Sequence, residues 1–411
     1  MAVVRSSFSR VRCFGFLAIA IPTLCASPAW GYLLTGRWTN TQTDGLLGPH
    51  DPATVTWSIV PDGVSTSRTD PGGSDLVAFF DRVYSVPSAD RTTDLTNRPW
   101  WQVMNRLMNK YTRTSGITMV YLAEQAGTDQ NGNLVNIGPV ADLRSAGKTH
   151  GGAILGAATS PNSGDIHFRT NDDYSPSETE WRKTFAHEVG HAVGIGHDSV
   201  TNHISVMDGS GGYQYFGVQF DDVYAMNRHY GDPLEKNGGN NTTASATDLG
   251  DLAVGGVIAR GTDINDMVLD EFDDDIVGIH HAGDVDFFAF TLTEAARVQI
   301  DVSPVGPTYT SREIDNNNPV NFMARADLNL TLTDTGGNVL VSADAGLVGT
   351  GESIDNWLLS PGDYLIRVDG DEDLNQFYSL TASAGVIPEP ASLALLALSG
   401  VLAAGRRRTG R

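Results

Sequence analysis

Cysteine is almost missing from this chain of 411 residues. The two that are present, Cys13 and Cys25, both lie in an amino-terminal segment that has the form of an export signal. Once that segment is removed the protein has no thiol, which excludes disulfide bonds and cysteine redox chemistry.

Basic residues are scarce as well. The sequence holds 27 Lys and Arg against 49 Asp and Glu, which gives a formal net charge of -22 at pH 7. Such acidity disfavours nucleic acid or an anionic membrane as a partner, because both repel negative charge. It is compatible with calcium in the surroundings, although solubility alone explains it. With 40% hydrophobic residues, the chain is long enough for two or three domains with real cores.

The amino-terminal segment has the parts of a signal peptide. Three arginines precede an apolar run over residues 13–24, and small residues at positions 27–29 offer a cleavage site. The run is too short for a comfortable membrane span. Residues 1–29 are therefore predicted to be cleaved, and the mature protein to be secreted.

The carboxyl-terminal segment has the form of a second targeting signal. Pro388-Glu389-Pro390 is followed by an apolar stretch and then by consecutive arginines. This order resembles the PEP-CTERM sorting signal of bacteria that make extracellular polysaccharide. The resemblance implies that an exosortase-type enzyme recognises residues 387–411, so that the membrane is met only transiently during export to the surface or matrix. A plain tail anchor is the alternative, because a short apolar run with basic flanks can lodge in a bilayer.

The most specific pattern begins at His187 and reads His-Glu-Val-Gly-His-Ala-Val-Gly-Ile-Gly-His. His187 and His191 are four residues apart, so on a helix both can face one metal ion. Glu188 can then reach a metal-bound water as general base and later acid. Gly194 can end the helix and let the chain return with His197 as a third ligand. Three imidazoles leave one position open on zinc, as in catalytic sites.

The sequence before this pattern predicts the helix that carries it. Ser177 and Glu180 have the spacing of a capping box, which marks a helix start. Trp181, Phe185 and Val189 follow at intervals of four residues. They predict an apolar stripe that packs inward, while the histidines face a cleft.

Met207 follows the third histidine by ten residues. The combination resembles the metzincin clan of zinc peptidases, and within it the matrixin-type catalytic domain. The resemblance implies that Met207 forms an apolar floor beneath the zinc ligands. It also implies a strand at residues 164–168, a closing helix at 220–231 and an edge strand at 152–157 beside which a substrate would lie. Gly209 stands where some clan members have a tyrosine ligand, and a cysteine latch is excluded by the cysteine positions.

Secondary metal sites are less well supported. Asp165 and His167 match matrixin positions that bind calcium and a structural zinc, and Asp172 is a further candidate ligand. Arg169 replaces a calcium-binding aspartate of the family, and the histidine expected near Gly156 is missing. Two histidines alone cannot supply the four protein ligands of a closed tetrahedral zinc site. We therefore expect His167 to be an exposed strand residue.

A different kind of sequence follows the expected closing helix. Glycine and asparagine predict a linker over residues 233–242. Beyond it, apolar residues alternate with polar ones in short runs separated by turns, which predicts an antiparallel β-sandwich over 243–386. The segments 284–288 and 359–364 resemble the bacterial prepeptidase carboxyl-terminal domain. The resemblance implies an accessory module for secretion, stability or substrate attachment.

Acidic residues of this second module raise the question of calcium. Residues 273–275, Asp284 and Asp286 could gather around an ion that takes six to eight oxygen ligands. No EF-hand and no glycine-aspartate repeat fixes their spacing. The blander prediction, a solvated acidic loop, is therefore preferred.

Together, the patterns and resemblances predict a two-module protein. Residues 30–232 are expected to form an α+β metzincin-like catalytic domain, with a twisted, mostly parallel sheet and an active-site helix, followed by an all-β sandwich. The predicted function is a secreted or surface-sorted zinc metalloendopeptidase that cleaves polypeptides, with Zn²⁺ as cofactor and Ca²⁺ left open.

The alternative function comes from another class. A non-catalytic surface or matrix protein could use a peptidase-like scaffold and bind polysaccharide or protein. Trp100 and Trp101 could then stack on carbohydrate, although buried core aromatics are the commoner case. The intact zinc pattern argues against this alternative.

Overall fold

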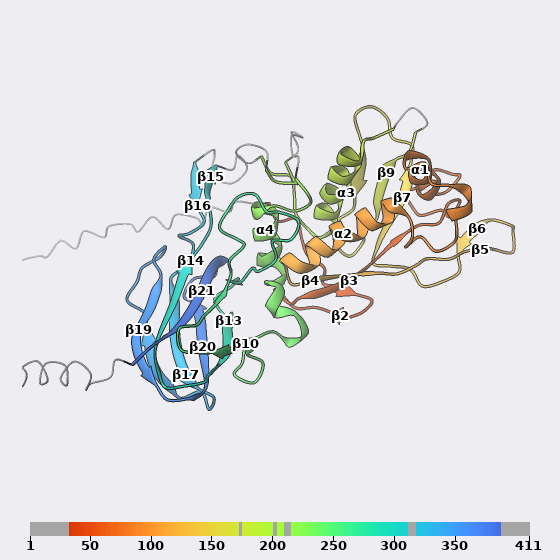
Figure 1. The fold of residues 1–411 in the computed structure, drawn as a ribbon. Coiled ribbons are helices and arrows are strands. Elements are labelled where there is room, and N and C mark those ends of the chain that lie inside the picture. Colours follow the sequence, from red (N-terminus) through yellow and green to blue (C-terminus); the bar gives the residue numbers. More distant parts are fainter. Residues whose placement is uncertain (1–32, 172–174, 200–203, 209–214, 311–317, 388–411) are drawn as a thin grey trace, which may run out of the picture.

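The computed structural model describes residues 33–171, 175–199, 204–208, 215–310 and 318–387. The predicted signal peptide and the Pro388-Glu389-Pro390 motif lie outside these residues. Within them, the chain forms two sheet-based modules with helix α4 (Phe220–Tyr230) between them (Figure 1). The described residues contain no helix that combines the length and the apolar character needed to span a bilayer.

The first module is built on one five-stranded sheet with the strand order β4-β3-β7-β9-β8. Three of its four strand pairs are parallel, and β8 alone runs antiparallel at one edge. The mostly parallel sheet expected from the sequence is therefore present. The strands are β3 (Ala53–Ile59), β4 (Ile117–Tyr121), β7 (Leu143–Lys148), β8 (Gly156–Ala158) and β9 (Ile166–Arg169).

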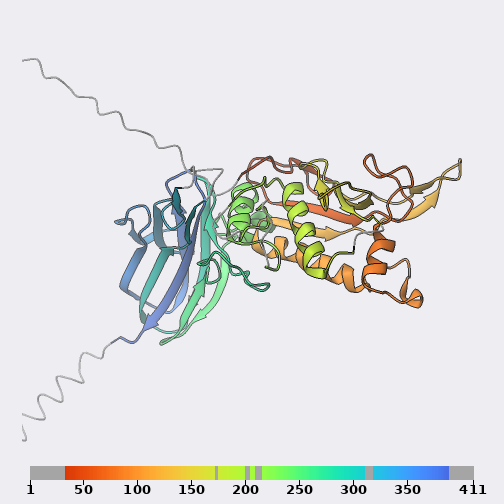
Figure 2. The ribbon, with the colours of Figure 1, turned by 90° about the horizontal axis from the view of Figure 1, so that it is seen from above.

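Two long helices, α2 (Pro99–Thr114) and α3 (Glu178–Ala192), lie side by side on one face of this sheet (Figures 1 and 2). Pro99 begins α2, where its missing N–H costs no hydrogen bond. Trp100 and Trp101 are buried in the core, at 0% and 7% exposure, so they offer no carbohydrate platform. Tyr111 of α2 donates a 2.6 Å hydrogen bond to the carbonyl of Ala186 and ties the two helices together.

The second module is a sandwich of two sheets, as expected. One has the order β10-β13-β20-β17-β18 and the other β11-β21-β14-β19, with β12 also paired to β21. The expectation of a purely antiparallel sandwich was wrong, because β10 pairs parallel with β13. The strands are β10 (Thr247–Leu252), β11 (Val257–Arg260), β12 (Gly278–Ile279), β13 (Val285–Leu292), β14 (Ala296–Pro304), β17 (Leu328–Asp334), β18 (Val339–Ala343), β19 (Glu352–Leu359), β20 (Gly362–Gly370) and β21 (Gln376–Gly385).

Short elements complete the two modules. Helix α1 (Leu76–Val83) packs beside β7. The remaining elements are β1 (Asn40–Thr41), β2 (Gly45–Leu46), β5 (Ala126–Thr128), β6 (Leu134–Asn136), β15 (Thr308–Thr310), β16 (Pro319–Asn321) and the 3-10 helices η1 (Ser88–Asp90) and η3 (Pro233–Gly238).

The junction between the modules is packed, which the sequence did not predict. Residues 233–242 were expected to be a linker, yet η3 fills most of that stretch and Glu235 is only 6% exposed. Phe322 and Phe377 of the second module belong to the hydrophobic core of the first. Their rings contact Phe220 of α4 at centroid distances of 5.3 and 5.7 Å. Burial of these rings holds the two modules together.

Candidate active site

Helix α3 begins where its cap predicts and carries the first two histidines toward a cleft. The Ser177 side chain accepts a 3.2 Å hydrogen bond from the Glu180 N–H. The helix ends at Ala192, and Gly194 takes a φ of 102°, a conformation that favours glycine. A Cβ at that position would lie 1.9 Å from the carbonyl oxygen of Gly36. Glycine therefore allows the tight turn that returns His197 to the helix.

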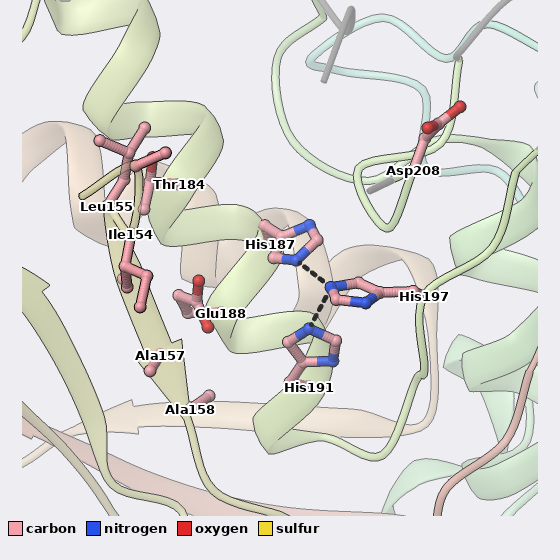
Figure 3. Close-up of a pocket in the computed structure, with 12 residues that line it drawn as sticks. Ile154, Leu155, Ala157, Ala158, Thr184, His187, Glu188, His191, His197 and Asp208 are labelled. Carbon is pink, nitrogen blue, oxygen red and sulfur yellow. Dashed lines mark hydrogen bonds between the residues drawn. The ribbon is translucent and has the colours of Figure 1, made fainter. Parts of the chain in front are cut away.

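Three imidazoles converge at this place (Figure 3). The Nε2 atom of His197 lies 3.0 Å from the Nε2 atoms of both His187 and His191. They form one of two groups of potential ligands that the described residues bring within 4.8 Å of one another. The sequence pattern thus corresponds to a real cluster of nitrogen donors.

The backbone orients two of these rings. His187 Nδ1 lies 2.7 Å from the carbonyl oxygen of Val206, and His191 Nδ1 lies 2.9 Å from that of Ile195. An Nδ1–H that donates to a carbonyl leaves the lone pair on Nε2, which is the arrangement of metal-binding histidines. Burial lowers the pKa of His187 to about 4 and also lowers that of His191. Both rings are therefore neutral at pH 7 and able to bind a metal, and three imidazoles on an open cleft fit zinc.

Glu188 points into the same cleft, beside strand β8 (Figure 3). Its side chain is 6% exposed, and burial raises its pKa to about 7. A carboxyl group with that pKa can take up and release a proton near neutral pH. Gly156 of β8 lies close by, since a Cβ there would stand 2.9 Å from Glu188 Cγ.

The cleft runs between α3 and β8 and has a volume of about 580 Å³. The edge strand is shorter than the predicted 152–157, because regular pairing with β9 covers only Gly156 to Ala158. Gly152 has a φ of 67°, which is incompatible with an extended strand. The lining residues are Ala153, Ile154, Leu155, Gly156, Ala157, Ala158, Thr184, His187, Glu188, His191, His197 and Asp208.

Met207 lies directly beneath the histidine helix. Its side chain is fully buried, and a Cβ on Gly190 would stand 2.2 Å from its sulfur. Gly190 stands between the first two histidines in the sequence. Met207 therefore contacts the helix at the position where the matrixin resemblance implies an apolar floor beneath the zinc ligands.

Asp222 of α4 anchors the turn that contains Met207, a role that the sequence analysis missed. Its carboxylate accepts hydrogen bonds from Ser205 Oγ at 2.6 Å, from the Val206 N–H at 2.9 Å and from the Met207 N–H at 3.3 Å. The spacing from Gln219 to Asp222 is that of a capping box, and this signal was legible in the sequence. The contact between Asp222 and the turn joins residues that are 15 or more positions apart, and no pattern in the sequence predicted it.

The predicted secondary metal residues do not gather in the described part of the chain. His167 was expected to be exposed, but it is 3% exposed, and Lys148 and His150 contribute to its electrostatic surroundings. Strand β9 is an inner strand of the sheet, paired on both edges, and helix α3 packs against it. Asp165 is half-buried and joins no group of three potential ligands among the described residues. Asp172 lies outside them.

The predicted solvated acidic loop was wrong for two of the residues. Asp284 and Asp286 are buried at 1% and 0% exposure, whereas residues 273–275 are exposed or half-buried. Asp275 accepts from Thr262 Oγ1 at 2.9 Å, and the backbone carbonyl of Asp273 accepts from Lys110 Nζ at 2.8 Å. The alternative, a calcium site that joins residues 273–275 with Asp284 and Asp286, therefore divides into separate sets.

Comparisons with known proteins agree with this picture. The Matrixin family model matches residues 142–231, the model of the bacterial pre-peptidase C-terminal domain matches 284–370, and that of the PEP-CTERM protein-sorting motif matches 386–408. The three resemblances identified in the sequence are thereby confirmed. The chain is a metallopeptidase-like protein that is extracellular or on the surface of a bacterium.

Three of the solved structures that are similar to this chain are distant from it in sequence. The pre-peptidase C-terminal domain of a collagenase from Bacillus anthracis is 14% identical, with 34% of this chain and 96% of that one covered and a TM-score of 0.20. A β-glucosidase from Paenibacillus barengoltzii is 12% identical, with coverages of 36% and 12% and a TM-score of 0.18. A periplasmic lysozyme inhibitor from Aeromonas hydrophila is 13% identical, with coverages of 34% and 99% and a TM-score of 0.16. Such low scores carry no functional argument. No curated protein matches the chain significantly.

Proposed function

We propose that this protein is a zinc metalloendopeptidase, exported or sorted to the cell surface, which hydrolyses peptide bonds in polypeptides. The observation that carries the proposal is the convergence of His187, His191 and His197 beside the buried carboxyl group of Glu188. Three imidazoles with an adjacent proton acceptor are the donor set of a hydrolytic zinc site.

The three histidines would hold the ion through their Nε2 atoms. A bound zinc ion supplies the polarisation of the scissile carbonyl and the acidification of a water molecule. Glu188 accepts a proton from the attacking water on a carboxylate oxygen and then delivers it to the leaving amine nitrogen. Its burial among β8 and α3 keeps bulk water away from the proton that it carries.

The edge of the sheet supports a polypeptide as the substrate. Within the part of the chain that the structure describes, strand β8 pairs only with β9, so its other edge has backbone donors and acceptors to offer along the cleft. An extended peptide can add to such an edge as a further strand. This arrangement would lay the peptide across the histidine cluster without requiring a particular sequence.

The test is hydrolysis of casein and of a broad peptide library by the purified protein, before and after removal of metal with a zinc chelator. We expect cleavage by the untreated protein, loss of activity with the chelator and recovery when zinc is added back. Inactivity at one zinc ion per histidine cluster would contradict the proposal. The scaffold of a surface or matrix-binding protein would then be the better account.

A further inference from the structure

A second cluster of ionisable side chains is buried where the two modules meet. None of its members lines the cleft of the candidate active site. Two follow α4 in the first module, and three lie at or just before β13 in the second. The members are Asp232, Glu235, His280, Asp284 and Asp286, with exposures of 0%, 6%, 2%, 1% and 0%.

One oxygen of each of three carboxylates is held in place. Asp284 Oδ2 accepts from the His280 N–H at 2.8 Å and lies 2.5 Å from His280 Nδ1. Glu235 Oε2 accepts from Asn241 Nδ2 at 2.9 Å. Asp286 Oδ2 accepts from the hydroxyl of Tyr378 at 2.5 Å. These contacts fix the orientation of all three carboxylates.

The other oxygen of each of these carboxylates has no hydrogen-bond partner within the described residues. The buried atoms without a partner are Glu235 Oε1, Asp284 Oδ1 and Asp286 Oδ1. Both polar side-chain atoms of Asn240 are likewise buried and without a partner among the described residues. Asn240 is itself only 1% exposed. Buried polar atoms are rarely left unsatisfied, and each one costs about 1–3 kcal/mol. So many at one place indicate a group that binds there.

The charge of the cluster points to a cation. Among the described residues, His280 is the only basic side chain within ion-pair distance of these carboxylates, while His281 and Lys236 interact electrostatically with Asp284 and Asp232 from further away. Asp232, Glu235, Asp284 and Asp286 therefore place four carboxyl groups, whose negative charges repel one another, in one buried region with a single imidazole as ion-pair partner. A positive charge inside the cluster would relieve the repulsion.

We propose that this cluster is a second metal site, which binds one divalent cation between the two modules. Glu235, His280 and Asp284 each offer a ligand atom within 4.8 Å of the others. The free oxygens of Asp286 and Asn240 add to the donors in the same buried region. Oxygen donors suit calcium, whereas the imidazole suits zinc or another first-row metal, so both kinds of ion belong to the test.

The site would join the modules at a defined point. Asp232 Oδ2 accepts a 2.8 Å hydrogen bond from the Gly278 N–H, which already links the end of α4 to the second module. An ion held by Glu235 from one side and by Asp284 from the other adds a second link. Because the same helix carries Asp222 at its start, the ion stabilises the element that supports the Met207 turn.

The test counts ions on the purified full-length chain after metal has been removed. A His187→Ala/His191→Ala background disables the candidate active site, and equilibrium dialysis is then run with calcium alone and with zinc alone. We expect one bound ion in this background and at least about tenfold weaker binding when Glu235→Gln and Asp284→Asn are added. His280→Gln should retain calcium but lose zinc, which identifies the kind of ion. Asp251→Asn, at an exposed carboxylate of β10, is the matched control and should bind as the background does.

Thermal unfolding keeps the test decisive if a variant folds poorly. In the His187→Ala/His191→Ala background, the ion should raise the unfolding midpoint by about 5 °C at one hundred times its dissociation constant. Adding Glu235→Gln/Asp284→Asn to this background should abolish the rise, yet without the ion the combined variant should be at least as stable as the background, because it removes buried charge. Equal binding by this variant and its background, or a background midpoint that no ion changes, would overturn the proposal.

Discussion

Gly156 helps to position Glu188, because glycine has no side chain. A Cβ on Gly156 would stand 2.9 Å from Glu188 Cγ, from Glu188 Oε1 and from Thr184 Cγ2. Real Cβ atoms do not approach other atoms so closely, and none of the three neighbours is on an exposed, freely moving chain end. Glycine at this place therefore lets the edge strand and the carboxyl group share one wall of the cleft.

Gly156→Ala should displace the Glu188 carboxyl group. We expect kcat to fall by about tenfold to one hundredfold, because misplacing a catalytic group by about 1 Å has effects of that size. The thermal midpoint should change little. Gly151→Ala is the matched control, since a Cβ there meets no atom within 4 Å. Equal kcat values for the two variants would show that the close approach has no catalytic role.

His229 should make the stability of the protein depend on pH. Burial lowers the pKa of this α4 histidine to about 4, against about 6.5 in an unfolded chain. Between these values the unfolded chain binds a proton that the folded protein does not. Stability is therefore complete above pH 6.5 and falls as the pH drops toward 4, by on the order of 2–3 kcal/mol.

Urea unfolding of wild type and of His229→Gln at pH 7.5 and pH 5 measures this effect. The loss of unfolding free energy on acidification should be smaller in the variant, by on the order of 2 kcal/mol. The zinc ligands titrate alike in both proteins, so the difference isolates His229. Parallel losses would mean that His229 does not carry the effect.

At the scale of elements, Val206 connects α4 with the histidine cluster. The Val206 N–H donates to Asp222 at 2.9 Å, and the Val206 carbonyl lies 2.7 Å from His187 Nδ1. The Met207 N–H, which shares a peptide group with that carbonyl, also donates to Asp222 at 3.3 Å. Asp222 thus holds the peptide that orients His187. Groups that orient a ligand from behind typically change metal affinity by about tenfold to one hundredfold when they are altered.

Asp222→Asn should weaken zinc binding by about tenfold, because an amide nitrogen cannot accept the backbone hydrogen bonds of the turn. Competition with a chromogenic zinc chelator gives the affinity. Asp373→Asn is the control, since this exposed carboxylate pairs with Arg228 near the other end of α4 at 3.0 Å. An affinity equal to that of the control would exclude the proposed chain of contacts.

The sequence predicts elements well where local chemistry decides them. The Ser177 cap and the stripe of Trp181, Phe185 and Val189 place the start and inner face of α3, and Gly194 places its end. Burial of His167 was mispredicted because alternation along a strand tells which residues share a face, but not what covers that face. The cover comes from parts of the chain that are distant in sequence, and no local pattern predicts it.

The cluster around Asp284 shows the same limit at longer range. Acidic residues in sequence favour a solvated loop, because charge is costly to bury. Glu235 and Asp284 come together only because η3 packs against the sandwich, across nearly fifty positions of chain. No rule of sequence spacing connects Glu235 with Asp284. The sequence therefore identified the acidic residues but did not predict that they lie together.

At the scale of the whole molecule, the two modules share one core across α4. Asn375 Nδ2 donates a 3.0 Å hydrogen bond to the Tyr224 carbonyl, and the Tyr224 hydroxyl donates back to the Asn375 carbonyl. Tyr309 of the second module donates to the carboxylate of Asp221. The structure therefore favours a single cooperative unit over two domains on a flexible linker.

Phe377→Ala tests this coupling. The ring is fully buried against Phe220 and Tyr224, so its loss should lower the free energy of unfolding by about 3–5 kcal/mol. The midpoint for thermal loss of zinc binding should fall together with it, although Phe377 lies in the second module. Phe272→Ala, at a ring that is 75% exposed, is the matched control. Separate transitions for the two modules would contradict a shared core.

If Glu188 transfers protons at a zinc site formed by three histidines, its removal should lower kcat while the bound zinc remains. The most direct measurement compares kcat on a casein-derived peptide for wild type, Glu188→Ala and Glu180→Ala, all brought to the same zinc content. Glu180 is an exposed residue of the same helix and serves as the control. We predict at least a roughly hundredfold loss for Glu188→Ala and none for Glu180→Ala. Equal rates for all three proteins at full zinc occupancy would contradict the claim.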